Sequence, residues 1–227
     1  MRAAGGPEVR DEGHAVKIVV FGATGRVGRR LVSGGIARGH EVTAAARRPE
    51  DVRERSRILR IVPCDLLDAA QVDAAVTGSE AVAVTVGARF AFAPGKIHSR
   101  GIANVITAMH SHAARRLICV SAIGTHDDND PNLPPVFTRV FRPLYLAGVW
   151  EQLRVMEAQI AGSGLDWTLV HVARLTNGPA LGRYRAEPGD SLRGALAISR
   201  RRRRLHAQGA RARRVDRPRR GARLLKT

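Results

Sequence analysis

Short runs of apolar and β-branched residues alternate along the chain with longer stretches whose apolar residues recur every three or four positions. The short runs predict buried strands at residues 16–21, 41–46, 58–62, 81–86, 116–121 and 167–171. The longer stretches predict helices at residues 25–37, 68–76, 99–113 and 152–160. Strands that alternate with helices pair in parallel through right-handed crossovers, so we expect an α/β fold with a doubly wound parallel sheet. Ligands of such sheets bind at the carboxyl ends of the strands.

The turn after the first predicted strand is rich in glycine and reads Gly22-Ala23-Thr24-Gly25-Arg26-Val27-Gly28. Glycine is required where the chain turns sharply, where backbone N–H groups approach a pyrophosphate, and where the helix packs closely on the sheet. The turn lies between a predicted strand and an amphipathic helix, and this position predicts a dinucleotide site. The alternative interpretation is a purely structural turn.

The end of the second predicted strand carries Arg47 and Arg48, and no carboxylate precedes Glu50. An NAD site usually has an acidic residue here to bind the ribose 2′-hydroxyl. Guanidinium groups instead suit a 2′-phosphate, and Arg26 can reach the same region. We therefore predict NADPH as the cofactor. The alternative is that Arg47 and Arg48 simply face solvent.

Residues after the third and fourth predicted strands complete the expected nucleotide site. Asp65 lies where its carboxylate can accept a hydrogen bond from the adenine amine, and Leu66 can pack on the ring. Gly87 and Arg89 line the route from pyrophosphate to nicotinamide. For that last pair, a loop glycine and a surface arginine are the alternative.

The segments at residues 19–28, 120–122, 163–168 and 173–179 resemble the atypical short-chain dehydrogenase/reductase proteins of the NAD(P)H-binding type. Within that group the chain looks most like the biliverdin reductase B/flavin reductase branch. The resemblance runs from about Val16 to Arg200 and implies a single Rossmann-like domain over residues 16–200. The chain departs from the family pattern at His171-Val172, where relatives often have Arg-Pro. We do not nominate His171 as a catalytic residue.

The resemblance also implies roles for particular residues. Cofactor contacts are implied at Thr24, Gly25, Arg26, Arg47, Asp65, Gly87 and Arg89. Ser121 is implied to stand beside the nicotinamide as the catalytic residue, and Arg174 to face cofactor or substrate. The alternative for Ser121 is a strand-end serine that satisfies local backbone groups.

The Tyr–Lys dyad of many short-chain dehydrogenases is missing from the sequence. Four residues after Tyr145 stands Val149, and four after Tyr184 stands Pro188. Without that acid–base pair, the predicted reaction is hydride transfer from NADPH to a small planar acceptor such as a flavin, a quinone or a tetrapyrrole. The alternative function is a non-catalytic NADP-binding sensor or regulatory protein.

The positive charge is divided unevenly along the 227 residues. Of the formal net charge of +18, residues 1–192 contribute +5 and residues 193–227 contribute +13. Because the basicity belongs to the end of the chain, we do not expect the folded body to bind nucleic acid.

An Arg-rich segment, residues 201–227, follows the predicted domain. Relatives continue here with a helix and a last strand, whereas this chain continues with Arg201-Arg202-Arg203-Arg204-Leu205. GC-rich codons for that helix, read out of frame, yield such a run of arginines. We therefore interpret the segment as a frameshifted remnant and expect the closing helix and strand to be lost. The alternative is a basic arm that binds nucleic acid or anionic surfaces non-specifically.

Other features of the sequence exclude several classes of protein. No apolar run reaches the ~20 residues of a membrane helix. Residues 1–15 carry no hydrophobic stretch before a cleavage site, so we expect a disordered leader without a secretory signal. The two cysteines, Cys64 and Cys119, argue against a disulfide scaffold or a metal cluster and favour the cytoplasm.

Overall fold

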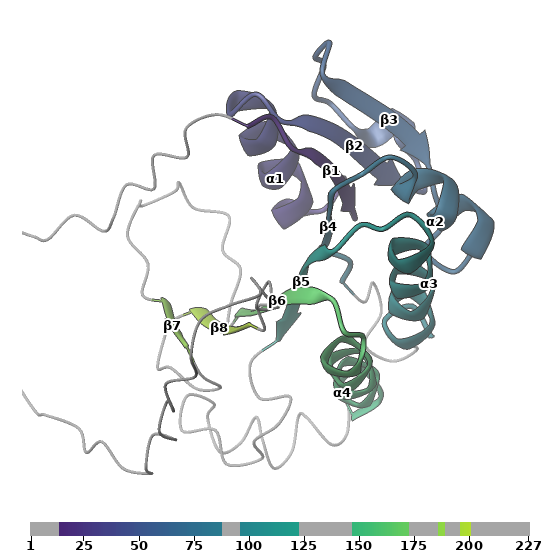
Figure 1. Ribbon diagram of the computed structural model, residues 1–227, viewed down its shortest axis with the longest axis vertical. Coiled ribbons are helices and arrows are strands. Elements are labelled where there is room, and N and C mark those ends of the chain that lie inside the picture. The colour runs from purple at the N-terminus through teal and green to yellow at the C-terminus, as the bar shows by residue number, and fades with distance from the viewer. Residues whose placement is uncertain (1–13, 88–95, 123–146, 173–185, 189–195, 201–227) are drawn as a thin grey trace, which may run out of the picture.

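A computed structural model describes residues 14–87, 96–122, 147–172, 186–188 and 196–200 (Figure 1). Its centre is one sheet in which six parallel strands lie in the order β3-β2-β1-β4-β5-β6. The order reverses between β1 and β4, as in doubly wound sheets, so the carboxyl ends of these two strands flank the crevice where such folds bind ligands. The predicted α/β fold with a Rossmann-like parallel sheet is confirmed.

The strands follow the predicted runs to within one or two residues at each end. Their bounds are β1 Lys17–Phe21, β2 Glu41–Ala46, β3 Leu59–Pro63, β4 Ala81–Val84, β5 Arg116–Ala122 and β6 Asp166–Val172. The helices are α1 Arg26–Ala37, α2 Ala69–Val76, α3 Ser99–Ser111 and α4 Ala147–Gly162, and a short 3₁₀ helix, η1, covers Pro49–Asp51. Asp68 caps the start of α2, because its carboxylate accepts hydrogen bonds from the backbone N–H groups of Ala70 and Gln71.

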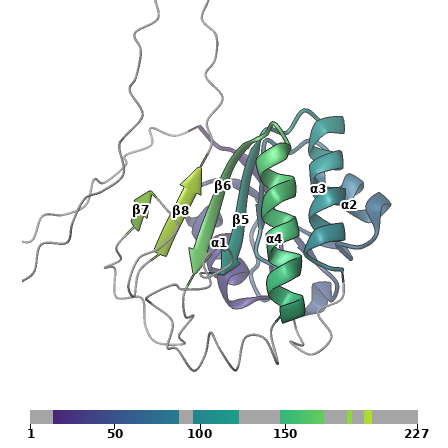
Figure 2. The same cartoon turned by 90° about the horizontal axis from the view of Figure 1, so that it is seen from below.

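The described helices cover the two faces of the sheet unequally (Figure 2). Helix α1 packs on one face through Val32, against a small apolar cluster from β1 and β2. Helices α2, α3 and α4 cover the other face and enclose the larger cluster, which includes Phe21, Met109 and Leu117. The strands are buried between these layers, which explains their nearly continuous apolar sequence.

Helix α4 begins five residues earlier than the predicted Gln152. The added turn contains Gly148 and Val149, which are weak helix formers, so the sequence pattern did not indicate it. Val149 and Trp150 are buried against the core, and this packing stabilises the helical turn.

Two short strands that the sequence analysis did not predict extend the sheet beyond β6. Strand β8 (Leu196–Arg200) pairs antiparallel with β6, and β7 (Ala186–Pro188) pairs with β8 in parallel.

The expected leader and the Arg-rich segment 201–227 fall outside the described residues apart from His14 and Ala15, so the expected loss of a closing helix and strand stays a prediction.

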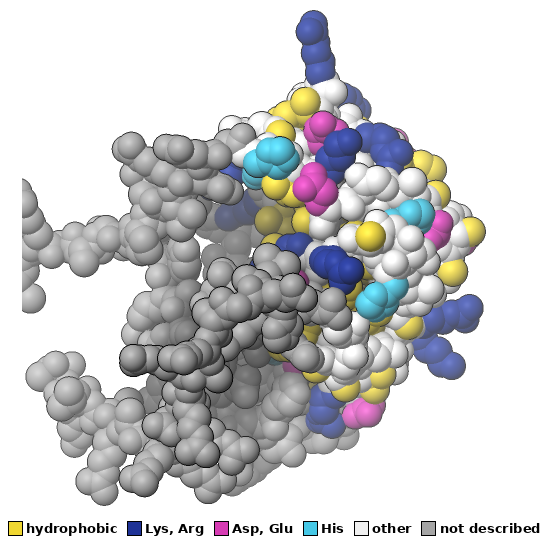
Figure 3. Space-filling view, in the orientation of Figure 1, with side chains coloured by type: hydrophobic (Ala, Val, Ile, Leu, Met, Phe, Trp, Pro, Cys, Tyr) yellow, Lys and Arg dark blue, Asp and Glu magenta, His cyan; other side chains and the backbone are white. Residues whose placement is uncertain are grey.

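Charged side chains of both signs are scattered over the face shown in Figure 3 and do not form one basic band. No helix in the described part of the chain is both long and apolar enough to cross a membrane. Within the same residues, no three His, Cys, Asp or Glu side chains are grouped as metal ligands. Both cysteines are buried free thiols.

Candidate functional site

The glycine-rich turn connects β1 to α1 and has a geometry that only glycine allows at two positions. Gly22 has a φ of +78°, in the left-handed region. A Cβ at Gly28 would lie 2.1 Å from the carbonyl oxygen of Gly22, so a side chain there would force the helix away from the turn. Helix α1 has no side-chain cap and no acidic residue in its first turn. Its first N–H groups therefore suit an external anion.

Thr85 fixes this turn against the end of β4. Its hydroxyl donates to the carbonyl oxygens of Phe21 at 2.9 Å and Gly22 at 3.3 Å, and its backbone N–H donates to Phe21 at 3.0 Å. A Cβ at Gly22 would come within 3.0 Å of Thr85. The turn and the end of β4 are therefore held in close contact.

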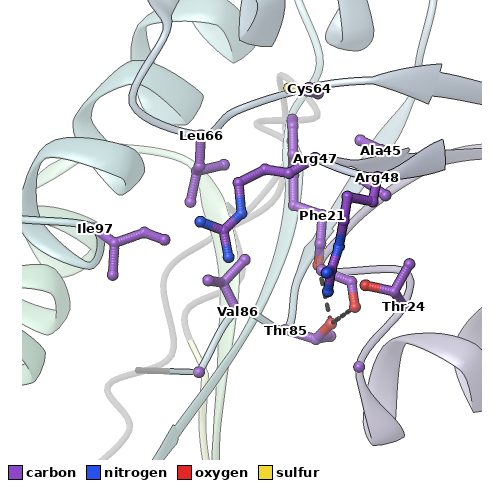
Figure 4. Close-up of a pocket in the computed structure, with 14 residues that line it drawn as sticks. Phe21, Thr24, Ala45, Arg47, Arg48, Cys64, Leu66, Thr85, Val86 and Ile97 are labelled. Carbon is purple, nitrogen blue, oxygen red and sulfur yellow. Dashed lines mark hydrogen bonds between the residues drawn. The ribbon is translucent and has the colours of Figure 1, made fainter. Parts of the chain in front are cut away.

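A pocket of about 180 Å³ opens at the carboxyl ends of β1 to β4 (Figure 4). It brings together seven of the predicted site residues, namely Gly22, Thr24, Gly25, Arg47, Arg48, Leu66 and Gly87. The other residues that line it were not predicted: Phe21, Ala45, Ala46, Cys64, Thr85, Val86 and Ile97. All of these lie at strand ends or just before α3, so their place at the carboxyl edge was the available signal.

The two arginines after β2 have different surroundings. In Figure 4 the guanidinium of Arg47 points across the pocket toward the side where Leu66 and Ile97 lie. Arg48 also lines the pocket, and its Nε atom forms an ion pair with the Oδ2 atom of Asp51 at 3.0 Å. Both arginines are exposed at the pocket edge, where they can meet an anionic ligand.

Leu66 is held in the pocket wall by helix α3. Gly101 leaves room for its side chain, because a Cβ there would lie 2.6 Å from a Leu66 methyl group, and Asn104 donates to the Leu66 carbonyl at 3.0 Å. Asp65 is not among the lining residues, and its Oδ1 atom accepts a hydrogen bond from the Leu67 N–H at 3.0 Å. Its predicted contact with adenine stays a prediction.

Cys64 also lines the pocket, next to Leu66. Burial raises the pKa of its thiol to about 11, and the negative charges of Asp65 and Asp68 add to that effect. The thiol is therefore neutral at physiological pH and presents an apolar surface rather than a nucleophile.

Three other predicted site residues are described by the structure but do not line the pocket. Arg26, Val27 and Gly28 belong to the first turn of α1, where Gly28 packs against the glycine-rich turn. Arg89 and Arg174 fall outside the described residues. Their predicted contacts with the cofactor stay predictions.

Ser121, the predicted catalytic residue, belongs to a buried polar cluster with Glu157 and His171. The Ser121 hydroxyl donates a hydrogen bond to the Oε1 atom of Glu157. The Nε2 atom of His171 lies 3.2 Å from the Oε2 atom of Glu157, an ion-pair distance without the angles of a hydrogen bond. Ser121, Glu157 and His171 are only 4%, 2% and 4% exposed.

The cluster joins three elements at the carboxyl edge of the sheet. Ser121 and His171 are register partners on β5 and β6, and Glu157 comes from α4. Burial raises the pKa of the nearby Cys119 thiol, and the negative charge of Glu157 contributes to the increase. Glu157 was not predicted, although a glutamate four residues after Leu153 and three before Ile160 falls on the buried side of the helix.

The sequence profile of a family described as NAD(P)H-binding matches residues 22–202. Among curated proteins, an uncharacterized chloroplastic protein of Arabidopsis thaliana is 28% identical over 185 residues. The match covers 78% of this chain, and the chain spans 65% of the length of the plant protein.

Two solved structures illustrate the structural likeness. ChuY, an anaerobilin reductase from Escherichia coli O157:H7, is 20% identical with a TM-score of 0.64, over 80% of this chain and 84% of ChuY. A short-chain dehydrogenase/reductase from Veillonella parvula, in complex with NADP, is 17% identical with a TM-score of 0.54, over 69% of this chain and 68% of that one. At these identities the two structures show the fold alone.

Proposed function

Because the chain belongs to the NAD(P)H-binding family, we propose that it is an NADPH-dependent reductase that delivers hydride to a planar acceptor such as a flavin, a quinone or a tetrapyrrole. The observation that carries the choice of coenzyme is the charge of the pocket. Arg47 and Arg48 line it, and none of its described lining residues is acidic. A ribose 2′-phosphate suits these guanidinium groups, whereas a free 2′-hydroxyl would lack its usual carboxylate partner.

The residues of the pocket fit such a coenzyme. The turn that Gly22 and Gly28 keep close to the sheet presents the first N–H groups of α1 to a pyrophosphate. Arg47 supplies the positive charge for the 2′-phosphate, and Leu66 supplies an apolar surface for the adenine. The reduced nicotinamide, when bound, supplies the hydride.

On the β5–β6 side, Ser121 orients the ligand rather than supplying a proton. Its hydroxyl hydrogen is already donated to Glu157, so its oxygen can only accept a further hydrogen bond, for example from a carboxamide N–H. Together with the missing Tyr–Lys dyad, this favours acceptors that need little acid–base help. ChuY, which shares the fold, is an anaerobilin reductase.

The test of coenzyme choice is calorimetry with NADPH and NADH on the wild-type protein and on Arg47→Ala. Losing charge-assisted hydrogen bonds of about 1.5–3 kcal/mol should weaken NADPH binding roughly ten- to hundredfold and leave NADH binding nearly unchanged. Arg53→Ala, an exposed arginine outside the pocket, is the matched control. Equal affinity of the wild-type protein for the two coenzymes would contradict the proposal.

The test of activity is NADPH oxidation followed by absorbance, against a panel of one flavin, one quinone and one tetrapyrrole. Oxidation that depends on an acceptor supports a reductase. Tight NADPH binding without oxidation by any acceptor would instead support a non-catalytic NADP sensor, which the commitment of the Ser121 proton to Glu157 also favours.

A further inference from the structure

Arg29 lies one turn into α1, half-buried and outside the pocket lining. Its side chain nevertheless contacts the glycine-rich turn and the segment after β2, and residues of both segments line the pocket. The Nε atom donates to the carbonyl oxygen of Thr24 at 3.0 Å, and a terminal guanidinium nitrogen donates to the carbonyl oxygen of Asp51 at 3.1 Å. One side chain therefore links the glycine-rich turn to the segment that follows β2.

The Asp51 end of this link is rigidly connected to the pocket arginines. Asp51 closes η1 through its backbone N–H, which donates to the Arg48 carbonyl at 3.1 Å, and its carboxylate holds the Arg48 side chain at 3.0 Å. Arg47 precedes this closed turn directly. The Thr24 end belongs to the turn that faces a pyrophosphate, and Thr24 itself lines the pocket. Beyond the β1–β2 pairing that ends at Phe21 and Ala45, Arg29 therefore adds a direct side-chain link between the glycine-rich turn and the segment after Arg47.

Arginine is suited to this link because its planar guanidinium presents several N–H donors in fixed directions. Two carbonyl oxygens from different segments can be held at once with little freedom between them. A lysine keeps the charge but has a compact ammonium on a flexible stem, so it does not fix the same separation.

We propose that Arg29 is a positioning residue that sets the preference for a coenzyme with a 2′-phosphate by fixing the distance between the pyrophosphate site and the Arg47–Arg48 pair. This inference rests on the proposed use of NADPH. A ligand that reaches only the glycine-rich turn and the adenine wall does not depend on that distance. Loss of the link therefore affects NADPH far more than NADH.

The experiment measures the dissociation constants of NADPH and NADH by calorimetry for the wild-type protein, Arg29→Gln and Arg29→Lys, with thermal unfolding of each. Both variants are expected to weaken NADPH binding about tenfold and to change NADH binding less than about twofold. Arg38→Gln is the matched control, because Arg38 caps the other end of α1 and its side chain donates to the Gly34 carbonyl of the same helix at 3.2 Å. It is expected to keep the wild-type ratio of affinities.

A double-mutant cycle tests whether Arg29 acts through Arg47. In an Arg47→Ala background, Arg29→Gln should have almost no further effect on NADPH binding. An unchanged ratio of affinities in both Arg29 variants overturns the inference, as does a full tenfold loss in the Arg47→Ala background. A wild-type ratio of NADPH to NADH affinity in Arg29→Lys also overturns the inference, because a positive charge at position 29 would then be enough for the preference without the fixed link. A wild-type protein without preference for NADPH overturns the proposed function itself, and that result is visible before any variant is made.

Discussion

The two halves of the sheet's carboxyl edge are built in different ways. At the ends of β1 to β4, the candidate site consists of main-chain groups in a tight turn and of exposed arginines at the pocket edge. At the ends of β5 and β6, the polar groups are buried, with a carboxylate from α4 held between a hydroxyl and an imidazole. The first arrangement is suited to binding a charged ligand. The second is suited mainly to holding three elements in register, and the ligand contact proposed for it is made through the Ser121 oxygen.

Because the two halves differ in this way, substitutions in them should have different effects, on ligand binding in one half and on stability in the other. Exposed guanidinium groups contribute little to folding because water screens them, so their loss should affect binding. A buried carboxylate has left water at a large cost in free energy, so the loss of one partner should affect stability. Substitutions at the β1–β4 ends should therefore change coenzyme affinity, and substitutions in the β5–β6 cluster should change the free energy of unfolding.

The largest effect is expected for Glu157→Ala. The substitution leaves Ser121 and His171 buried without their shared partner and creates a cavity beneath α4. We expect the free energy of unfolding to fall by about 3–5 kcal/mol, measured by urea denaturation. Glu151→Ala, at an exposed position on the same helix, should stay within about 0.5 kcal/mol of the wild-type value. A loss below about 1 kcal/mol at Glu157 would show that the cluster does not stabilise the β5–β6 half.

A large effect on binding is expected for Gly28→Ala. Its Cβ would overlap the Gly22 carbonyl, so α1 must move from the turn and the N–H groups that face a pyrophosphate move with it. NADPH affinity should fall by more than about a hundredfold in calorimetry. The control is Gly34→Ala in the same helix, where a Cβ would meet only the end of the Arg38 side chain at 3.4 Å. That control should stabilise the helix by about 0.5–1 kcal/mol. Unchanged binding in Gly28→Ala would contradict a pyrophosphate site at this turn.

A smaller effect is expected from acidification, through His98 before α3. Burial lowers the pKa of His98, and its Nε2 atom has no hydrogen-bond partner among the described residues. Below about pH 6.5 the imidazole of His98 therefore binds a proton more readily in the unfolded chain than in the folded protein. The free energy of unfolding should decrease as the pH falls below that value. Urea denaturation at several pH values, compared with His98→Gln, measures this contribution. Identical pH slopes for the two proteins would exclude it.

The β1–β4 half could be predicted from the sequence to a greater extent than the β5–β6 half. The glycine-rich turn and the Arg47–Arg48 pair are contiguous in the chain, so local spacing indicates them. Thr85 and Cys64 were missed as pocket residues because nothing in their own neighbourhood distinguishes them from other strand-end residues. Only the pairing of β1 with β4 places Thr85 against Gly22.

The Ser121 cluster could not be found by spacing, because its three members are separated by 36 and 14 residues and meet only through tertiary packing. Strand β8 escaped prediction for a related reason. It is five residues long and gains its hydrogen bonds from β6, so its own sequence carries little of the information that makes it a strand.

The direction of β8 has a practical consequence for protein engineering. Because β8 runs antiparallel to β6, with Ala197 opposite His171 and Arg200 opposite Thr168, the strand leads from the carboxyl edge of the sheet toward the amino end of β6. A fluorescent fusion or an affinity tag joined directly after Arg200 would therefore start on the side remote from the nucleotide crevice. Shortened chains that end at this strand offer a way to measure coenzyme binding without the twelve basic residues that follow.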